Sequence, residues 1–374
     1  MIYLDSAATS FQKPASVGPA MGRALAAMSS PGRGGYEAAM LASDTLLECR
    51  LALQRLFRVR EPENVVFTMN ATHALNIAIR SLVPAGGRAV ISGWEHNAVT
   101  RPLHTLGAEL WVARGRLFDD GAFLEDWEKA LREGADAAVC TQVSNVFGWA
   151  LPIREAAELC RERGVPLIVD ASQGAGVLPL DCEGLSLAYA AMPGHKGLLG
   201  PQGTGVLICG EGQTPEPILR GGTGSLSRQQ EMPDFLPDRL EAGTHNVPGI
   251  AGLLAGIRFV EEIGLDAIRE HEQALCRRAG EGLCAIPGME VFRGPGQTGV
   301  LSFRHREIPA ETLGETLSRR GVALRTGLHC APLAHESAGT LETGTLRASF
   351  SLFNREEEVE AFLAAVEEAG GKKS

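Results

Sequence analysis

The sequence predicts an α/β protein built around a mostly parallel sheet. Through the middle of the chain, short apolar runs alternate with amphipathic stretches of helical length, a pattern typical of βαβ units. Polar residues such as His96, Asp170 and Lys196 come just after apolar runs, where parallel sheets bind their ligands. With 374 residues, 44% of them hydrophobic, the chain can form one large domain and a smaller second one.

The hydrophobic pattern places each element along the chain. Strands are expected at 63–68, 87–92, 135–144, 165–170, 187–193, 203–210, 298–305 and 345–353. Helices are expected at 71–83, 153–164, 247–264, 265–283, 309–321 and 354–370. A segment rich in Pro, Asp and Gly, 233–246, leads into the second part of the chain. Asn354 followed by Glu357 has the pattern of a helix N-cap.

Charge and cysteine spacing narrow the class of protein. The formal net charge of −10 argues against a nucleic-acid or anionic-membrane surface. No run of about 18 apolar residues could span a bilayer. The start, MIYLDSAATS, lacks the pattern of a secretory signal, so we expect a cytoplasmic protein. None of the eight cysteines stands in a C-x-x-C pair, so no metal site is expected.

The cysteines differ in their surroundings. Those in apolar segments, including Cys284 in GLCAI, are expected to be small buried side chains. Cys330, in RTGLHCAPLAHESAGT, has Gly, His and Pro neighbours, which are typical of a loop. Its thiol is therefore expected to be accessible.

Two residues of the central part suggest cofactor chemistry. Asp170, after the apolar run VPLIV, could cap a turn or could hold the ring nitrogen of a pyridinium in its protonated form. Lys196, in AMPGHKGLLGPQG, could form a Schiff base with an aldehyde if its pKa is lowered. An Asp at a strand end with Gly-His-Lys 26 residues later (196 − 170) is more specific to pyridoxal phosphate enzymes than either residue alone.

Two further segments allow both a functional and a structural interpretation. In NATHALN, the amides of Ala71 and Thr72 begin a helix, which could bind a phosphate group or could simply be capped. His96, just past an apolar strand, could stack on a planar ring and move protons, or could be an ordinary surface histidine.

These residues lie in motifs that resemble those of cysteine desulfurases and selenocysteine lyases, which are class V aminotransferase-like pyridoxal phosphate enzymes of fold type I. The motifs, in order, are YLDSAATS, NATHALN, EHNAV, VSNVFG, VDASQ, GHKGLLGPQGTG, EAGTHN, RTGLHCAP and LRASFSLFN. They span nearly the whole chain, and the cysteine loop resembles that of group II members. The resemblance implies a large cofactor-binding domain at 15–258. Residues 1–14 and 259–374 would form a smaller α+β domain that carries the cysteine loop and a substrate arginine.

The resemblance also implies the residues that hold pyridoxal 5'-phosphate. Lys196 is similar to the lysine that forms the Schiff base. The other matching positions are Ala71, Thr72 and His195 at the phosphate, His96 stacked on the ring, Asp170 at the ring nitrogen, and Asn145 and Gln173 at the ring oxygen. Thr244 resembles a threonine that reaches the phosphate of the other subunit, which implies a homodimer with shared active sites.

The substrate residues and the reaction follow from the same resemblance. Arg347 matches an arginine whose bidentate fork clamps the substrate carboxylate, and Arg33 and Asn145 match neighbouring substrate ligands. Lys196 would remove the α-proton of L-cysteine, and the Cys330 thiolate would attack its sulfur, so that alanine leaves and Cys330 carries a persulfide. His329 is a candidate base for that thiol only by adjacency.

Several expectations stay open at this stage. L-selenocysteine is a second expected substrate, and a sulfur-acceptor protein and a role in iron–sulfur cluster assembly are implied. The alternatives are another class V enzyme (an aminotransferase, epimerase or C–S lyase) and a non-catalytic sulfur-transfer scaffold. The chain also departs from the family pattern. Pro193 stands where a phosphate-binding hydroxyl is common, His73 where Glu is frequent, and Tyr36 where a histidine is usual.

Overall fold

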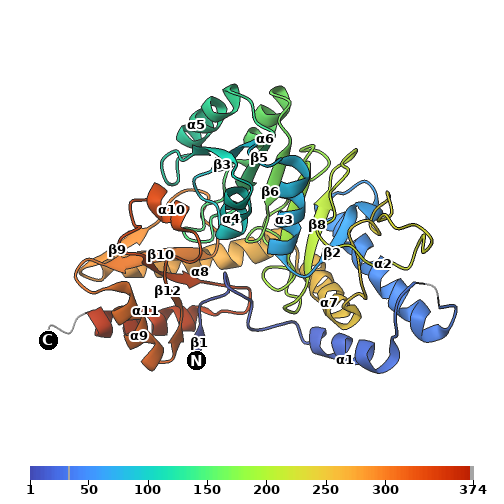
Figure 1. Ribbon diagram of the computed structural model, residues 1–374. Helices are drawn as coiled ribbons and strands as arrows, with labels where there is room; N and C mark the ends of the chain where they lie inside the picture. The colour runs from blue at the N-terminus through green and yellow to red at the C-terminus, as the bar shows by residue number, and fades with distance from the viewer. Residues whose placement is uncertain (33, 371–374) are drawn as a thin grey trace.

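A seven-stranded sheet forms the centre of the computed structural model, which describes residues 1–32 and 34–370 (Figure 1). Its strands are β2 (Val65–Thr68), β3 (Arg88–Ser92), β4 (Glu109–Ala113), β5 (Ala137–Thr141), β6 (Leu167–Asp170), β7 (Tyr189–Pro193) and β8 (Gly205–Cys209). The order across the sheet is β2-β8-β7-β6-β5-β3-β4. The pairs from β7 to β4 are parallel, and only β8 runs against its neighbours. The predicted α/β fold with a mostly parallel sheet is confirmed.

Helices cover both faces of this sheet, because successive side chains of a strand point to opposite sides. Ala89 and Ile91 of β3 belong to one buried cluster, together with residues of α3 (Ala71–Leu82) and α4 (Asn97–Thr105). Val90 belongs to the other. Residues of six helices share that second cluster: α1 (Val17–Ala27), α2 (Glu37–Phe57), α5 (Asp120–Arg132), α6 (Ile153–Glu162), α7 (Val247–Ile263) and α10 (Pro332–Ser337).

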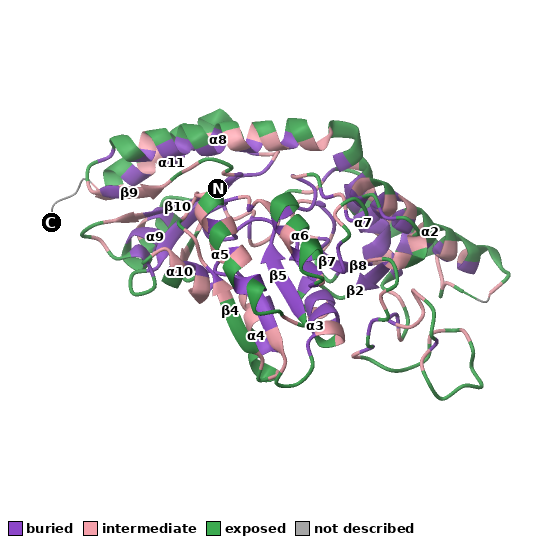
Figure 2. Cartoon of the chain, turned by 90° about the horizontal axis from the view of Figure 1, so that it is seen from above, coloured by how far each residue is buried: buried purple, intermediate pink, exposed green. Residues whose placement is uncertain are grey.

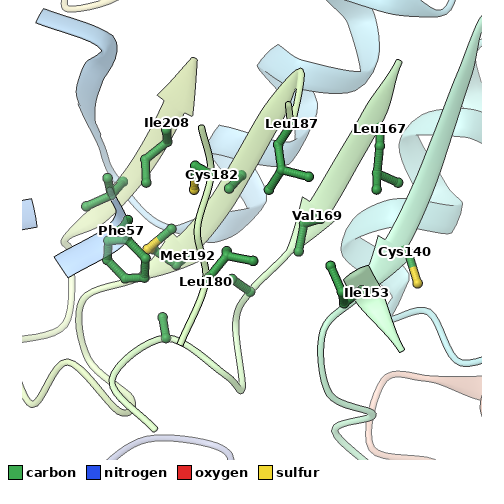
Figure 3. Packing of buried hydrophobic residues seen from close by; sticks show 14 of the residues in the cluster. Phe57, Cys140, Ile153, Leu167, Val169, Leu180, Cys182, Leu187, Met192 and Ile208 are labelled. Carbon is green, nitrogen blue, oxygen red and sulfur yellow. The ribbon is translucent and has the colours of Figure 1, made fainter. Parts of the chain in front are cut away.

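The interior of the second cluster is apolar and contains several thiols. Figure 3 shows Cys140 and Cys182 among side chains such as Leu167 and Val169. In Figure 2 the strands of the central sheet are mostly buried, whereas many helices expose their outer faces. Both observations agree with the expectation that most of the cysteines are small buried side chains.

A second, antiparallel sheet follows in the last third of the chain. Its order is β12 (Arg325–Gly327), β13 (Thr345–Ser349), β10 (Val300–His305) and β9 (Met289–Phe292). The remaining elements are η1 (Pro62–Asn64), α8 (Leu265–Ala285), α9 (Ala310–Arg319), α11 (Glu356–Gly370), and β1 (Ile2–Tyr3), which pairs with β11 (Val322–Ala323). A separate buried cluster joins this sheet to α8, α9 and α11. The β1–β11 pair brings the start of the chain to this second part, while the domain boundaries at 15 and 258 stay predictions.

Two local predictions are wrong. Cys284 is exposed on α8 instead of buried, because the apolar pattern around it marks the opposite face of the helix. The acid that caps the N-terminus of α11 is Glu358, not Glu357. The Asn354 side-chain amide and the Arg355 backbone amide donate to Glu358 Oε2 at 3.1 and 3.0 Å. The helix begins at Glu356, so Glu358 takes the position that can reach back to these donors.

None of the helices in the described part of the chain is both long and apolar enough to cross a membrane.

Candidate active site

A cavity of about 110 Å³ lies at the carboxyl ends of the central strands. Eight predicted residues line it: Ala71, Thr72, His96, Asn145, Asp170, Gln173, His195 and Lys196. Thr244 lines a different cavity, together with His73. Arg33 lies outside the residues that the structure describes. The strand ends therefore bring together eight side chains that are dispersed over more than a hundred positions in the sequence.

Lys196 and Asp170 give this cavity its electrostatic character. Burial lowers the pKa of Lys196 to about 8, and the nearby Asp170 carboxylate opposes this shift. Asp170 is the last residue of β6, where its Oδ1 accepts a hydrogen bond from the Ser172 amide at 2.9 Å. A lysine with a lowered pKa holds more neutral amine near neutral pH, and the neutral amine is the form that attacks an aldehyde.

His96 is fixed by its position at the start of α4. Its Nδ1 accepts a hydrogen bond from the Ala98 amide at 3.0 Å, so it serves as the N-cap of the helix. Burial lowers the pKa of His96, and an imidazole that accepts at Nδ1 carries its proton on Nε2. The ring is therefore a neutral plane held at the wall of the cavity.

Another end of the cavity is suited to an anion. The amides of Ala71 and Thr72 are the first of α3 and have no acceptor within the helix. They point toward an incoming anion, as at other helix starts. His195 pairs through Nδ1 with Thr9 Oγ1 at 2.9 Å, and burial lowers its pKa to about 4, so it is a neutral partner. Pro193 also lines the cavity but has neither a hydroxyl nor an amide hydrogen to donate.

The residues present fit pyridoxal 5'-phosphate. The start of α3 and His195 would hold its phosphate, Asp170 its ring nitrogen, and Lys196 its aldehyde carbon. His96 would lie against the ring. The aldehyde, pyridinium and phosphate each need a different partner, and the cavity supplies an amine, a carboxylate and free amides to match.

The loop that carries Cys330 is attached to this cavity by two hydrogen bonds. Asn145 Nδ2 donates to the His329 carbonyl at 2.8 Å, and the Asn97 amide donates to the Cys330 carbonyl at 2.8 Å. His329 and Cys330 both have left-handed backbone angles, with φ of 48° and 57°. Such angles are uncommon for residues other than glycine, and the surrounding bonds hold the loop in this form. As predicted, the Cys330 side chain is exposed.

Neither ring nitrogen of His329 is hydrogen-bonded to the Cys330 thiol in the described part of the chain. His329 is buried, and its Nε2 pairs with Thr345 Oγ1 at 3.0 Å. Burial lowers the pKa of His329 to about 2, so the ring stays neutral. Its Nδ1 has no partner among the described residues. The geometry gives His329 the role of an anchor for the loop, which does not favour the idea that it is a base for Cys330.

Arg347 connects the two sheets. It is buried in β13, where its Nη1 donates to the Asn145 carbonyl at 2.9 Å and its Nη2 to Asp5 Oδ1 at 2.8 Å. Its Nε has no acceptor in the part of the chain that the structure describes. Asn145 thus touches both the cysteine loop and the arginine while it lines the cavity of Lys196.

The sequence assigns no role to two acids of this region. Asp5 becomes a partner of Arg347 only through the pairing of the chain's start with the second sheet, which leaves no local signal. Glu95 is buried, and its Oε1 accepts from Ser92 Oγ at 2.5 Å and from the Thr141 amide at 2.7 Å. Burial raises the pKa of Glu95 to about 8. The one feature of the sequence that marks Glu95 is its position shortly after an apolar strand.

Comparison with known proteins places the chain in a family. Residues 2–362 match the model of the aminotransferase class-V family, so the chain belongs to this family of pyridoxal phosphate enzymes. A probable cysteine desulfurase from Halalkalibacterium halodurans is 32% identical over 98% of this chain and 92% of its own length. One from Methanothermobacter thermautotrophicus is 31% identical over 99% and 95%. The solved apo structure of a cysteine desulfurase from Thermococcus onnurineus superposes with a TM-score of 0.90 at 32% identity, covering 99% of this chain and 94% of that one.

Proposed function

We propose that this protein is a pyridoxal phosphate-dependent cysteine desulfurase, which converts L-cysteine to L-alanine and leaves the sulfur on Cys330 as a persulfide. The observation that carries the proposal is the position of Asn145. It lines the cavity of Lys196, and it also hydrogen-bonds the loop of Cys330 and accepts from Arg347. A Schiff-base lysine, an exposed thiol and a carboxylate-binding arginine therefore meet around one residue.

The residues divide the chemistry among themselves. When bound, pyridoxal phosphate withdraws electrons from the α-carbon of the substrate. Lys196 takes the α-proton, and Arg347 orients the substrate through its carboxylate. The Cys330 thiolate attacks the substrate sulfur. A sulfur–sulfur bond forms, and the bond from sulfur to Cβ breaks with its electron pair going to Cβ. Cβ takes up the proton that Cys330 lost on becoming a thiolate, and Lys196 returns the α-proton to Cα, so alanine leaves and Cys330 carries the persulfide.

Several finer features belong to the same proposal. A homodimer is supported by exposed apolar side chains on the first two helices, among them Leu25 and Met40 at 74% and 53% exposure. Thr244, exposed and outside the cavity of Lys196, would reach the phosphate of the partner's site. L-selenocysteine as a second substrate, a sulfur-acceptor protein and a role in iron–sulfur cluster assembly rest on family resemblance. Eight free thiols support a reducing location such as the cytoplasm.

The test measures alanine and sulfide released from L-cysteine in the presence of a thiol reductant. The Cys330→Ser variant should lose sulfide release by at least about a hundredfold, because serine cannot carry the sulfur. It should keep the visible absorption of the bound cofactor. The matched control is Cys284→Ser, which removes the other exposed thiol and should behave as wild type.

The same assay separates the alternatives. Lys196→Ala should lose both the visible band and all turnover. An aminotransferase would keep its activity in Cys330→Ser, and a scaffold would release neither product. Either result would overturn the proposal, as would a wild type that stays colourless with added pyridoxal phosphate. Selenide release that survives in Cys330→Ser would assign the selenium substrate a route that does not use the thiol.

A further inference from the structure

A second, smaller cavity lies on the other side of Lys196. Its volume is about 40 Å³, enough for two or three water molecules. Lys196 and Gln173 line both this cavity and the cofactor cavity. Residues of α8 and of the segment that follows β13 also line the second cavity, so it lies between the two sheets. Polar side chains from several separate parts of the chain line it, and they are Ser6, Ser10, Gln173, Lys196, Glu272, Thr298 and Ser351.

The most unusual of these groups is Glu272 of α8. The residue is buried, at 8% exposure, and no lysine, arginine or histidine of the described chain forms an ion pair with its carboxyl group. The Leu352 backbone amide lies close enough to favour the charged form of the carboxyl group, but burial outweighs this effect. A buried carboxyl group without a counter-charge is costly, so it is rarely kept without a use.

Gly299 shows that the fold makes room for this acid. A Cβ atom at Gly299 would lie 2.9 Å from Glu272 Cβ and 3.1 Å from its Oε2. Any larger residue would therefore push the helix or the carboxyl group away. The close approach of α8 to the start of β10 holds Glu272 at the cavity that Lys196 also lines.

Ser6 supplies a further polar group to the cavity that Lys196 and Glu272 line. Its Oγ is buried and has no hydrogen-bond partner in the described part of the chain. The next residue is held in place, because the Gln173 side-chain amide donates to the Ala7 carbonyl at 2.9 Å. A buried hydroxyl without a partner in a cavity of this size is a site for an ordered water molecule.

We propose that Glu272 is a proton store for Lys196, which it reaches through Ser6 and water in this cavity. After Lys196 has taken the α-proton of the substrate, its ammonium group passes one proton along the cavity to the Glu272 carboxylate. The products are a neutral amine and a neutral acid, so charge and protons balance. Glu272 does not touch the substrate and acts only through Lys196. The inference rests on the proposed function only in that Lys196 exchanges an α-proton.

The acid–base properties of the two groups fit this exchange. Burial lowers the pKa of Lys196 to about 8 and raises that of Glu272 to about 8. A proton therefore moves between them with little change in free energy. Among the described residues that line the cavity, these are the only two that ionise. On α8 itself, His271 bonds the Asn354 carbonyl at 3.0 Å, and Cys276 stays a neutral thiol because burial raises its pKa to about 12.

The first experiment compares wild type with Glu272→Gln in the holoenzyme. Glutamine keeps an acceptor for the Leu352 amide but cannot ionise. The readout is the pH titration of the visible band of the bound cofactor, which reports the charge at the Lys196 nitrogen. A unit charge about 10 Å away shifts a neighbouring pKa by about one unit at an effective dielectric constant of about 20. We expect the midpoint to fall by at least about half a unit. Glu270→Gln, exposed on the same helix, should titrate as wild type.

The second experiment follows exchange of the α-proton of L-alanine with D2O by NMR, in a Cys330→Ser background. It needs the cofactor and Lys196 but not sulfur transfer, so it can succeed even if desulfurase activity fails. Glu272→Gln and Ser6→Ala should each slow exchange at least about fivefold. If Glu272→Gln does not fold, the Ser6→Ala variant provides the test. Slower α-proton exchange in Ser6→Ala would support the role of Glu272 as a proton store. An unchanged exchange rate, or an unchanged band titration in folded Glu272→Gln, would overturn it.

Discussion

Replacing Arg347 with lysine should weaken the binding of the substrate carboxylate by a predictable amount. The guanidinium has five N–H donors, of which one bonds the Asn145 carbonyl and one the Asp5 carboxylate. Three donors remain for a ligand. A lysine ammonium has three donors in all, so one remains once the same two partners are satisfied. The variant therefore loses at least one charge-assisted hydrogen bond to the substrate.

The expected loss follows from that difference. A hydrogen bond to a charged group contributes about 1.5–3 kcal/mol, which corresponds to a fall of about 10- to 150-fold in kcat/KM. Most of it should appear in KM, because the carboxylate is bound equally before and during the reaction. The assay is alanine formation from L-cysteine over a range of concentrations. The visible cofactor band should be unchanged, because Arg347 does not line the cofactor cavity.

Two results would refute this reasoning. A change in kcat/KM of less than about threefold would mean that Arg347 does not bind the substrate carboxylate. Loss of the cofactor band would mean that the ion pair with Asp5 mainly holds the fold together. The control is Arg319→Lys, because Arg319 is exposed and, among the residues that the structure describes, forms an ion pair only with Glu315 one helical turn away. It should leave both kinetic constants as in wild type.

Two further predictions concern stability and cofactor affinity. Burial holds the pKa of Glu95 at about 8, above its unfolded value, so its contribution to stability is fully present below about pH 4.5 and is lost as the pH rises toward 8. In urea unfolding, wild type should therefore lose on the order of 3 kcal/mol relative to Glu95→Gln between pH 5 and pH 8, and a constant difference would contradict this. A Cβ atom at Gly205 would lie 2.5 Å from the Asn70 carbonyl carbon, so Gly205→Ala should displace the start of α3, the proposed phosphate site, and weaken cofactor binding at least about tenfold. Titration of the visible band with pyridoxal phosphate measures this, with Gly18→Ala, which meets no atom within 4 Å, as the control.

The elements that could be predicted are those whose signal is local. The buried strands β5 and β6 are continuous apolar runs, and their limits were predicted within a few residues. Strand β4 was not predicted, although its sequence ELWVA contains a short apolar run. It lies at the edge of the sheet, where Glu109, Leu110 and Trp111 are exposed.

The residues of the candidate site also differ in whether a local sequence pattern reveals them. Lys196 and Asp170 could be recognised because reactive side chains directly after apolar runs lie at the carboxyl edge of a parallel sheet. Glu272 could not, because in the stretch REHEQALC it looks like one more polar residue on an amphipathic helix. Glu272 is buried because α8 packs closely against Gly299. This contact joins distant parts of the chain, and no local pattern encodes it.

The first ten residues tie the two halves of the site together. Asp5 pairs with Arg347, and the Ala7 amide donates to Ser349 Oγ at 2.9 Å, so this segment is fixed to the sheet that carries the proposed substrate arginine. Thr9 Oγ1 pairs with His195 at 2.9 Å, which fixes the same segment beside Lys196, the proposed Schiff-base lysine. Residues 5–9 therefore link the proposed substrate arginine to the proposed cofactor cavity. A change within this segment, such as Asp5→Asn, should therefore alter the geometry at Arg347 and Lys196 together, in contrast to a change in either sheet alone.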